Sequence, residues 1–191
     1  MKKILTITLM LSMVYSAMGQ VSPKKYDIKS GMVKTSTEVM GQKTETTTYF
    51  DNYGAQEATK AKMNVPGFGE METATIIKDG KAWMVNYTMK QVQELPLEAV
   101  TDINFVNPSE EAIKEYKLQE EGKETILGKE CTKYTYEASA QGQTAKITAW
   151  IYKGIALKSV TTLAGMEITA EATGLLENIM VLPQTFDVPK F

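Results

Sequence analysis

Short runs of alternating side chains, separated by two-residue turn signals, recur along most of this sequence. The clearest is TATIIKDGKAWMVNY, residues 73–87, in which Asp79-Gly80 suits a type I′ turn because both central residues of that turn need a positive φ angle. Over residues 166–172, apolar and polar side chains alternate strictly, which predicts a strand with one face toward the core and the other toward water. Such a chain is expected to form antiparallel hairpins.

The pattern predicts at least eight strand segments and one helix. The helix is expected over residues 107–118, where Ser109 suits the N-cap position and Glu110 and Glu111 complement the positive end of the helix dipole. Residues 66–72 are expected to form a loop, Gly154 a bulge, and the tail from Leu182 an extended segment. The main strand-like segments are 25–40, 43–50, 73–87, 89–97, 130–139, 144–152, 155–163 and 166–174.

The predicted fold class is therefore mainly β: a large curved antiparallel sheet or half-open β-barrel with one short helix. The segment TAKITAWIYKGIALKS, residues 144–159, poses a question for this fold. Its two faces are both partly apolar, because Trp150 and Tyr152 lie on one and Ile147 and Ile151 on the other. A half-solvated sheet has one dry face, so something must cover the second. We expect one face to pack in the core and the other to line a cavity.

The N-terminus has the pattern of an export signal. Lys2 and Lys3 precede an apolar stretch over residues 4–14, and Ala17 and Gly19 occupy the −3 and −1 positions of a signal-peptidase site. The expected organisation is a signal peptide over residues 1–19 and a single β-rich domain over residues 20–191. The mature protein is expected to be periplasmic or secreted. No segment after the signal is long and apolar enough to be expected to span a membrane.

Several residue types that catalysis and ligand recognition commonly use are absent. The chain has no histidine, the usual general base near neutral pH, and all 21 of its basic residues are lysines, which cannot reproduce the bidentate fork of arginine. Cys131 is the single cysteine and is expected to be a small buried apolar residue. With a net charge of −2 and no basic cluster, the chain is not expected to bind nucleic acid. We expect no enzyme activity, no cofactor and no metal site.

The segment ETILGKECTKYTYEASAQGQTAKITAWIYKGIALKS resembles the C-terminal half of small exported bacterial proteins with the LolA-like, lipoprotein-carrier type of fold. The similar features are a Gly-x-x-Cys-x-x-Tyr strand (Gly128, Cys131 and Tyr134), the Trp150-Ile151 strand and the apolar-Lys pair Leu157-Lys158. This resemblance implies a half-open antiparallel barrel with a helix or loops over a hydrophobic concave face. Many relatives with this pattern have no assigned function.

The chain departs from that family at one functional position. Lipoprotein carriers of this type are thought to use an inward arginine to control opening and lipid release, and this sequence contains no arginine. The resemblance therefore implies the fold without implying the carrier activity.

Two functions from different classes remain open. The first is a non-catalytic protein that binds an apolar ligand, a lipid or acyl chain, on the concave face of the sheet. For it the expected ligand-binding residues are the aromatics Trp150, Tyr152, Trp83 and Tyr134. The second is a structural or interaction module of the cell envelope that binds another protein through a sheet edge or apolar patch and has no ligand pocket.

Overall fold

The computed structural model describes residues 24–39, 42–65, 69–97, 103–140 and 143–191. The predicted signal peptide and its cleavage site lie outside these residues. The elements within them are β1 (Gly31–Val39), β2 (Gln42–Asp51), η1 (Asn52–Gly54), β3 (Gln56–Val65), β4 (Gly69–Lys78), β5 (Lys81–Asn86), β6 (Gln91–Leu95), α1 (Glu110–Glu115), β7 (Gln119–Ile126), β8 (Lys129–Ala140), β9 (Gln143–Tyr152), β10 (Ile155–Leu163), β11 (Met166–Glu177) and η3 (Pro183–Phe186).

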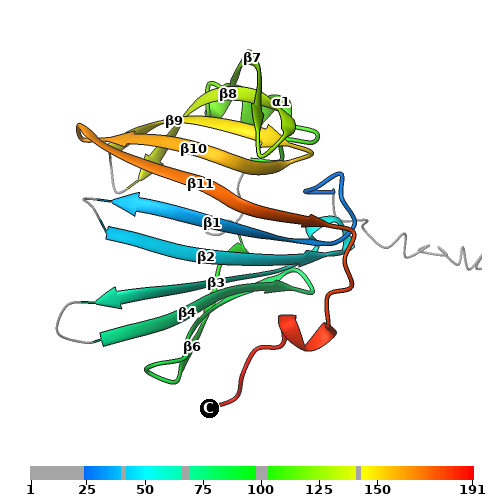
Figure 1. Ribbon diagram of the computed structural model, residues 1–191, viewed down its shortest axis with the longest axis vertical. Helices are drawn as coiled ribbons and strands as arrows, with labels where there is room; N and C mark the ends of the chain where they lie inside the picture. The colour runs from blue at the N-terminus through cyan, green and yellow to red at the C-terminus, as the bar shows by residue number, and fades with distance from the viewer. Residues whose placement is uncertain (1–23, 40–41, 66–68, 98–102, 141–142) are drawn as a thin grey trace, which may run out of the picture.

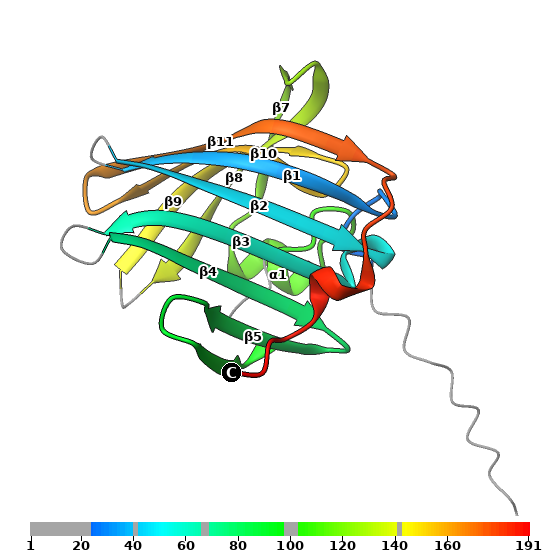
Figure 2. The same ribbon diagram turned by 60° about the horizontal axis from the view of Figure 1, so that its bottom comes forward.

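The described strands form one antiparallel sheet of eleven strands, in the order β6-β5-β4-β3-β2-β1-β11-β10-β9-β8-β7. Each half of the chain is a run of hairpins, and the two halves join where the first strand pairs with the last, β1 with β11. The sheet curves strongly without closing, so β6 and β7 remain as edges (Figures 1 and 2). The predicted fold class is confirmed.

The connection from β6 to β7 begins at one edge of the sheet and ends at the other. It carries α1, which lies inside the curve of the sheet (Figure 2). Ser109 caps α1 as predicted, its hydroxyl accepting from the Ala112 N–H at 3.1 Å. The helix is shorter than predicted because Lys117 adopts a positive φ of 50° and the Leu118 N–H donates back to the Ile113 carbonyl at 2.9 Å.

The turns follow the sequence signals closely, with one correction. Asp79 and Gly80 both have positive φ, as the predicted type I′ hairpin requires. Gly154 was predicted to form a bulge, but it forms a tight turn with Lys153, where both residues again have positive φ. The bulge lies just beyond, between Ala156 and Lys158 of β10.

Four segments differ from the prediction. The first strand begins at Gly31; residues 24–30 bend across the end of the sheet, although Tyr26, Ile28 and Ser30 share a buried side as expected. Strand β3 was not predicted, and β4 starts at Gly69, inside the predicted loop. The tail contains the η3 turn instead of being fully extended. In β11 the predicted phase holds at Ala172, which is buried, but Met166 at the turn is exposed.

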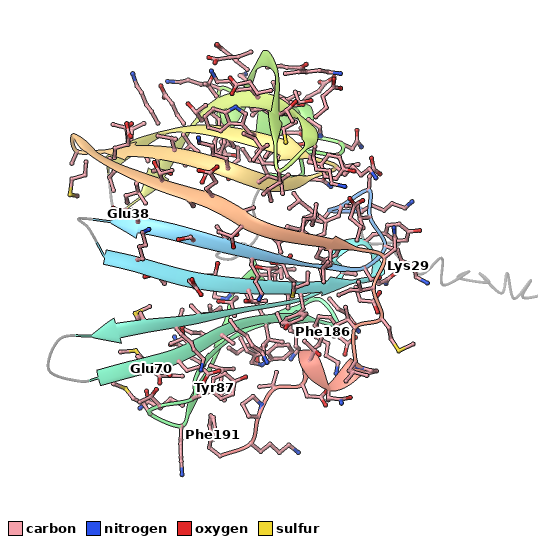
Figure 3. The ribbon with its side chains drawn as sticks, in the orientation of Figure 1. Lys29, Glu38, Glu70, Tyr87, Phe186 and Phe191 are labelled. Atoms are coloured by element: carbon pink, nitrogen blue, oxygen red, sulfur yellow. The ribbon has the colours of Figure 1, made fainter. Side chains whose placement is uncertain are left out.

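The C-terminal tail covers the outer face of the first half of the sheet. Phe186, 1% exposed, packs with Ala58, Ala74, Ile76 and Val85. These residues lie on β3, β4 and β5, and Figure 3 shows Phe186 against this part of the sheet. Further along the tail, Phe191 meets Tyr87 edge to face with ring centroids 6.3 Å apart. The C-terminal tail therefore covers part of the outer face of the sheet, so no other molecule is needed to cover that part.

Trp150 on β9 is covered in a different way. It is 9% exposed and is flanked on the neighbouring strands by Lys133 and Lys158, whose ammonium nitrogens lie 5.6 and 5.3 Å from the indole centroid. The two lysines are held by Glu121 at 3.1 Å and Glu171 at 3.9 Å. The aliphatic stems of lysine cover apolar surface while their charged ends remain in water.

Glu177, at the end of β11, ties three strands of the second half together. Its carboxylate accepts from the Lys129 ammonium at 2.5 Å, from the Lys153 ammonium at 3.3 Å and from the Tyr152 hydroxyl at 3.3 Å. The hydrogen bond from Lys129 is the main cause that lowers the pKa of Glu177, and Lys153 lowers it further.

We expect Glu177→Gln to lower the free energy of unfolding by about 1–2 kcal/mol at pH 7, because it weakens hydrogen bonds to a charged group. A carboxyl whose pKa is lowered on folding contributes stability above its unfolded pKa, and that contribution is lost as the pH falls through the lower folded pKa. Urea melts of the two proteins should therefore converge below about pH 4. Glu130→Gln is the control: its partner Lys123, at 2.8 Å, and Glu130 itself are exposed. A change as large in the control would contradict the special role of Glu177.

Candidate functional site

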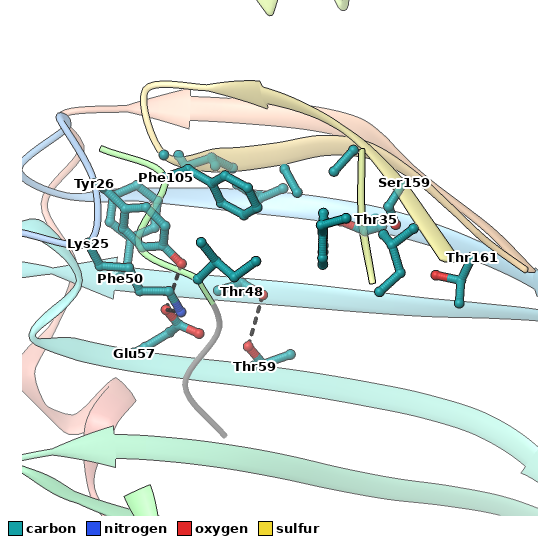
Figure 4. A pocket seen from close by; sticks show the side chains of 18 residues that line it. Lys25, Tyr26, Thr35, Thr48, Phe50, Glu57, Thr59, Phe105, Ser159 and Thr161 are labelled. Atoms are coloured by element: carbon teal, nitrogen blue, oxygen red, sulfur yellow. Dashed lines mark hydrogen bonds and ion pairs between the residues drawn. The ribbon is translucent and has the colours of Figure 1, made fainter. Parts of the chain in front are cut away.

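The concave face of the sheet contains a cavity of about 340 Å³ (Figure 4). Strands from both halves of the chain line it, including Val33 on β1, Thr48 on β2, Thr59 on β3 and Ala149 on β9. The hollow exists because small residues meet in the register: Ser159 on β10 lies between Ala149 and Ala170 of the adjacent strands. Small side chains at facing positions leave space that larger ones would fill.

A loop closes part of the open side of this cavity. Ile103 and Phe105 line the cavity, and the Phe105 ring packs on Tyr134 and Tyr136 of β8 with centroids 5.4 and 5.8 Å apart. Asn104 holds the loop in shape. Its side-chain oxygen accepts from the Val106 N–H at 3.1 Å, and its amide donates to the Lys24 carbonyl at 3.0 Å. These hydrogen bonds hold the loop over residues 103–107, called the roof loop below, against the N-terminal segment.

A charged group closes one end of the cavity. The Glu57 carboxylate accepts from the Lys25 ammonium at 2.9 Å and from the Tyr26 hydroxyl at 2.7 Å, as Figure 4 shows. Both charged side chains are largely buried, and Tyr26 packs on Phe50 with ring centroids 4.7 Å apart. The pair therefore neutralises its own charge inside the lining.

Hydroxyl groups form much of the remaining polar lining. Thr48 and Thr59 face each other across β2 and β3, with their oxygens 2.9 Å apart. Thr35, Ser159 and Thr161 also line the cavity. The sequence contained a signal for this surface: threonines alternate at 35 and 37 and again at 44, 46 and 48. The alternation predicts strands there, but it does not show which face of the sheet the threonines occupy.

A second cavity of about 500 Å³ adjoins the first. The two share Ile103, Tyr136 and Ile147, so together they form a groove along the concave face. The second cavity extends to the end of α1, where Tyr116 lines it and the Lys117 ammonium donates to Glu137 at 2.6 Å.

The four aromatics predicted to bind ligand lie in three separate places, with Trp150 and Tyr152 together on one face of β9, and none of them is among the described residues that line the first cavity. Trp150 and Tyr152 have the opposite phase on β9 from Ile147 and Ala149, which do line it. Trp83, on β5, packs with the cluster beneath the C-terminal tail. Tyr134 contacts the roof residue Phe105. Ligand binding by these four stays a prediction, and the structure does not bring them together.

Among the described residues, this groove has neither an exposed thiol nor a metal-binding cluster beside it. Cys131 is fully buried, and burial raises the pKa of its thiol. In the described part of the chain, no group of three or more Asp, Glu, Cys or His side chains is placed to hold a metal ion. No helix among these residues is both long enough and apolar enough to cross a membrane. What the site offers chemically is enclosure, hydroxyl hydrogen bonds and apolar contact.

Solved structures from several bacteria share features of this fold. The chain is similar to an uncharacterized conserved protein from Thermus thermophilus, with a TM-score of 0.56 and 14% identity, covering 87% of this chain and 90% of that one. It is similar to a chain of the Pseudomonas aeruginosa MucA/MucB complex, with a TM-score of 0.53 and 13% identity, covering 84% of this chain and 56% of that one. A putative outer membrane lipoprotein-sorting protein domain from Vibrio parahaemolyticus matches with a TM-score of 0.41 and 9% identity, covering 83% and 89%.

The two matches with TM-scores above 0.5 show likeness of fold, and the LolA-like fold that the sequence resemblance implied is confirmed. No curated protein matches the sequence. A family match does cover most of the chain, since residues 30–180 match the family described as "Domain of unknown function (DUF4412)". The matched range includes β1 to β11 and therefore the whole strand lining of the groove. The protein belongs to the DUF4412 family.

Proposed function

We propose that this protein is an exported, non-catalytic binding protein that holds the apolar part of a small ligand in the groove of its concave face. The observation that supports this most is the cavity itself. Its 340 Å³ fall within the range of about 300–1,000 Å³ that is typical of small-molecule sites. The lining combines apolar side chains with a few hydroxyls, as such sites do. The N-terminal export pattern supports a periplasmic or secreted location.

Filling the cavity should weaken binding without unfolding the domain. Thr161 is half buried and lines the cavity, so Thr161→Phe places a ring in the space that a ligand would occupy. We expect the affinity for the uncharged fluorescent probe N-phenyl-1-naphthylamine to fall at least about tenfold, or about 1.4 kcal/mol. Fluorescence titration measures this, and circular dichroism checks the fold.

Thr162→Phe is the matched control, because Thr162 is the next residue on the same strand, points to the opposite face and is exposed. It should bind the probe as the unmodified protein does. Equal affinity of both variants would show that the probe does not enter this cavity. Absence of any binding by the unmodified mature protein, together with native mass spectra free of co-purified ligand, would overturn the proposed function.

The alternative is a cell-envelope module that binds another protein, as the MucA/MucB complex with its related fold suggests. The two sheet edges argue against pairing with a partner strand. β6 has five residues, four of them exposed, and β7 carries three glutamates and a lysine on a nearly fully exposed strand. Short and charged edge strands discourage pairing with another chain. A pull-down from envelope extract that retains a stoichiometric protein partner would favour the alternative.

A further inference from the structure

The charges of the groove, more than its size, restrict what can bind there. Lys25 is the one cation among the described side chains that line the first cavity, and it is bound to Glu57. The Tyr26 hydroxyl also donates to this carboxylate. The cation is therefore engaged already, and an anionic group entering the cavity would meet Glu57 together with its partner.

The adjoining cavity is no more favourable to an anion. Its charged lining residues, within the part of the chain that the structure describes, are Glu115, Lys117 and Glu137, and Lys117 is bound to Glu137. Across the described lining of the whole groove two lysines face three glutamates, which gives a net charge of −1. A carboxylate or phosphate buried here would lose its hydration without gaining a free cation, which is strongly unfavourable.

The hydroxyls, in contrast, offer unused hydrogen bonds. Thr48 and Thr59 bond to each other, whereas Thr35, Ser159 and Thr161 make no side-chain hydrogen bond within the described residues. These three come from β1 and β10, which β11 separates in the sheet. Between them, β11 presents the small side chains of Ala170 and Ala172. The groove thus has donors for neutral oxygens beside the space for a chain.

We infer that the ligand is an uncharged amphiphile: one acyl or alkyl chain joined to an ester- or hydroxyl-bearing head that carries no ionised group. The inference rests on the proposed function and narrows it to one ligand class. The chain lies along the apolar lining, and the ester or hydroxyl oxygens accept from, or donate to, Thr35, Ser159 and Thr161. An anionic head finds no free cation in the described lining. A cationic head finds no free buried carboxylate there, because Glu57 and Glu137 are each bound to a lysine and Glu115 is exposed.

Three ligands with the same twelve-carbon chain test this: 1-monolauroylglycerol, laurate and dodecylamine, each below its micellar concentration at pH 8. Each competes with bound N-phenyl-1-naphthylamine on the mature protein. We expect the affinity of monolauroylglycerol, measured from this competition, to be at least about tenfold higher than that of either charged homologue. Equal or tighter binding of laurate or dodecylamine overturns the inference while the proposed function stands. A probe that never binds the unmodified protein contradicts the proposed function instead.

Two variants connect the selectivity to named groups. Glu57→Gln keeps the shape of the side chain but leaves the Lys25 charge uncompensated, so the ratio of monolauroylglycerol to laurate affinity should fall about tenfold. Thr161→Val removes a hydroxyl at nearly constant volume and should weaken monolauroylglycerol more than the probe, which lacks ester oxygens. Circular dichroism checks whether each variant is folded. Unchanged selectivity in a folded Glu57→Gln protein overturns the electrostatic explanation.

Discussion

Phe186→Ala should lower the free energy of unfolding by about 3–5 kcal/mol, the usual cost of truncating a fully buried phenylalanine. Phe186 is 1% exposed and packs on Ala58, Ile76 and Val85 of the outer face. Removing its ring deletes the main contact between the tail and the sheet, and small residues such as Ala58 cannot refill the space. Urea denaturation of the mature protein measures the effect.

Phe191→Ala provides the control in the same tail. Phe191 is 57% exposed and its ring lies nearly perpendicular to that of Tyr87, so its truncation should cost less than about 1 kcal/mol. If both variants lose the same stability, the tail acts as one unit and the buried ring has no special role. If neither loses stability, the tail does not cover the outer face in solution.

Gly154→Ala should cost about 2–5 kcal/mol and should also disturb the groove. The turn at Gly154 has a φ of +86°, which costs about 1–2 kcal/mol for a residue with a Cβ atom. A Cβ here would also overlap the carbonyl oxygen of Lys25 and lie 2.8 Å from Cγ2 of Val106. Overpacking of this kind adds about 1–3 kcal/mol. The substitution would displace the N-terminal segment at Lys25 and the roof loop at Val106, which lie beside the cavity. Probe binding should therefore weaken together with stability.

Gly165→Ala separates the cost of the positive φ angle from the cost of the steric overlap. Gly165 lies in the β10–β11 turn with a φ of +80°, and a Cβ there would meet nothing within 4 Å among the described residues. It should therefore show only the cost of the backbone conformation and leave probe binding unchanged. Urea melts and titrations of both variants decide the matter. Equal losses at the two glycines would mean that the contact with Lys25 relaxes without cost.

The turns and the helix cap could be predicted from the sequence, whereas one central strand could not. Local pattern predicted the hairpin at Asp79-Gly80 and the cap at Ser109, because each depends on neighbouring residues alone. It missed β3, whose Lys-Ala-Lys run has little apolar content and gains its place from pairing with β2 and β4. Strand pairing of this kind is a tertiary effect.

The location of the groove shows the same limit. Alternation along β9 correctly separated Trp150 from Ala149, yet it could not say which face is concave. The aromatics lie mostly on the outer face, while the hollow arises from alanines, serine and threonines on β1–β3 and β9–β10, two runs of strands that are far apart in the sequence. A cavity arises where neighbouring side chains are too small to fill the space. Small residues show no distinctive sequence pattern for this, because only strand pairing places them side by side.

By itself the sequence determined the fold class, the hairpin at Asp79-Gly80 and the helix cap at Ser109, since alternation, turn residues and caps act over short distances. It also determined the restriction on ligand recognition, because a chain without arginine has only lysine to neutralise an acid. The tertiary structure alone decided that β1 pairs with β11, that Lys25 meets Glu57 and that the C-terminal tail covers the outer face. Each of these joins residues distant in the chain, whose contact depends on the curvature of the whole sheet.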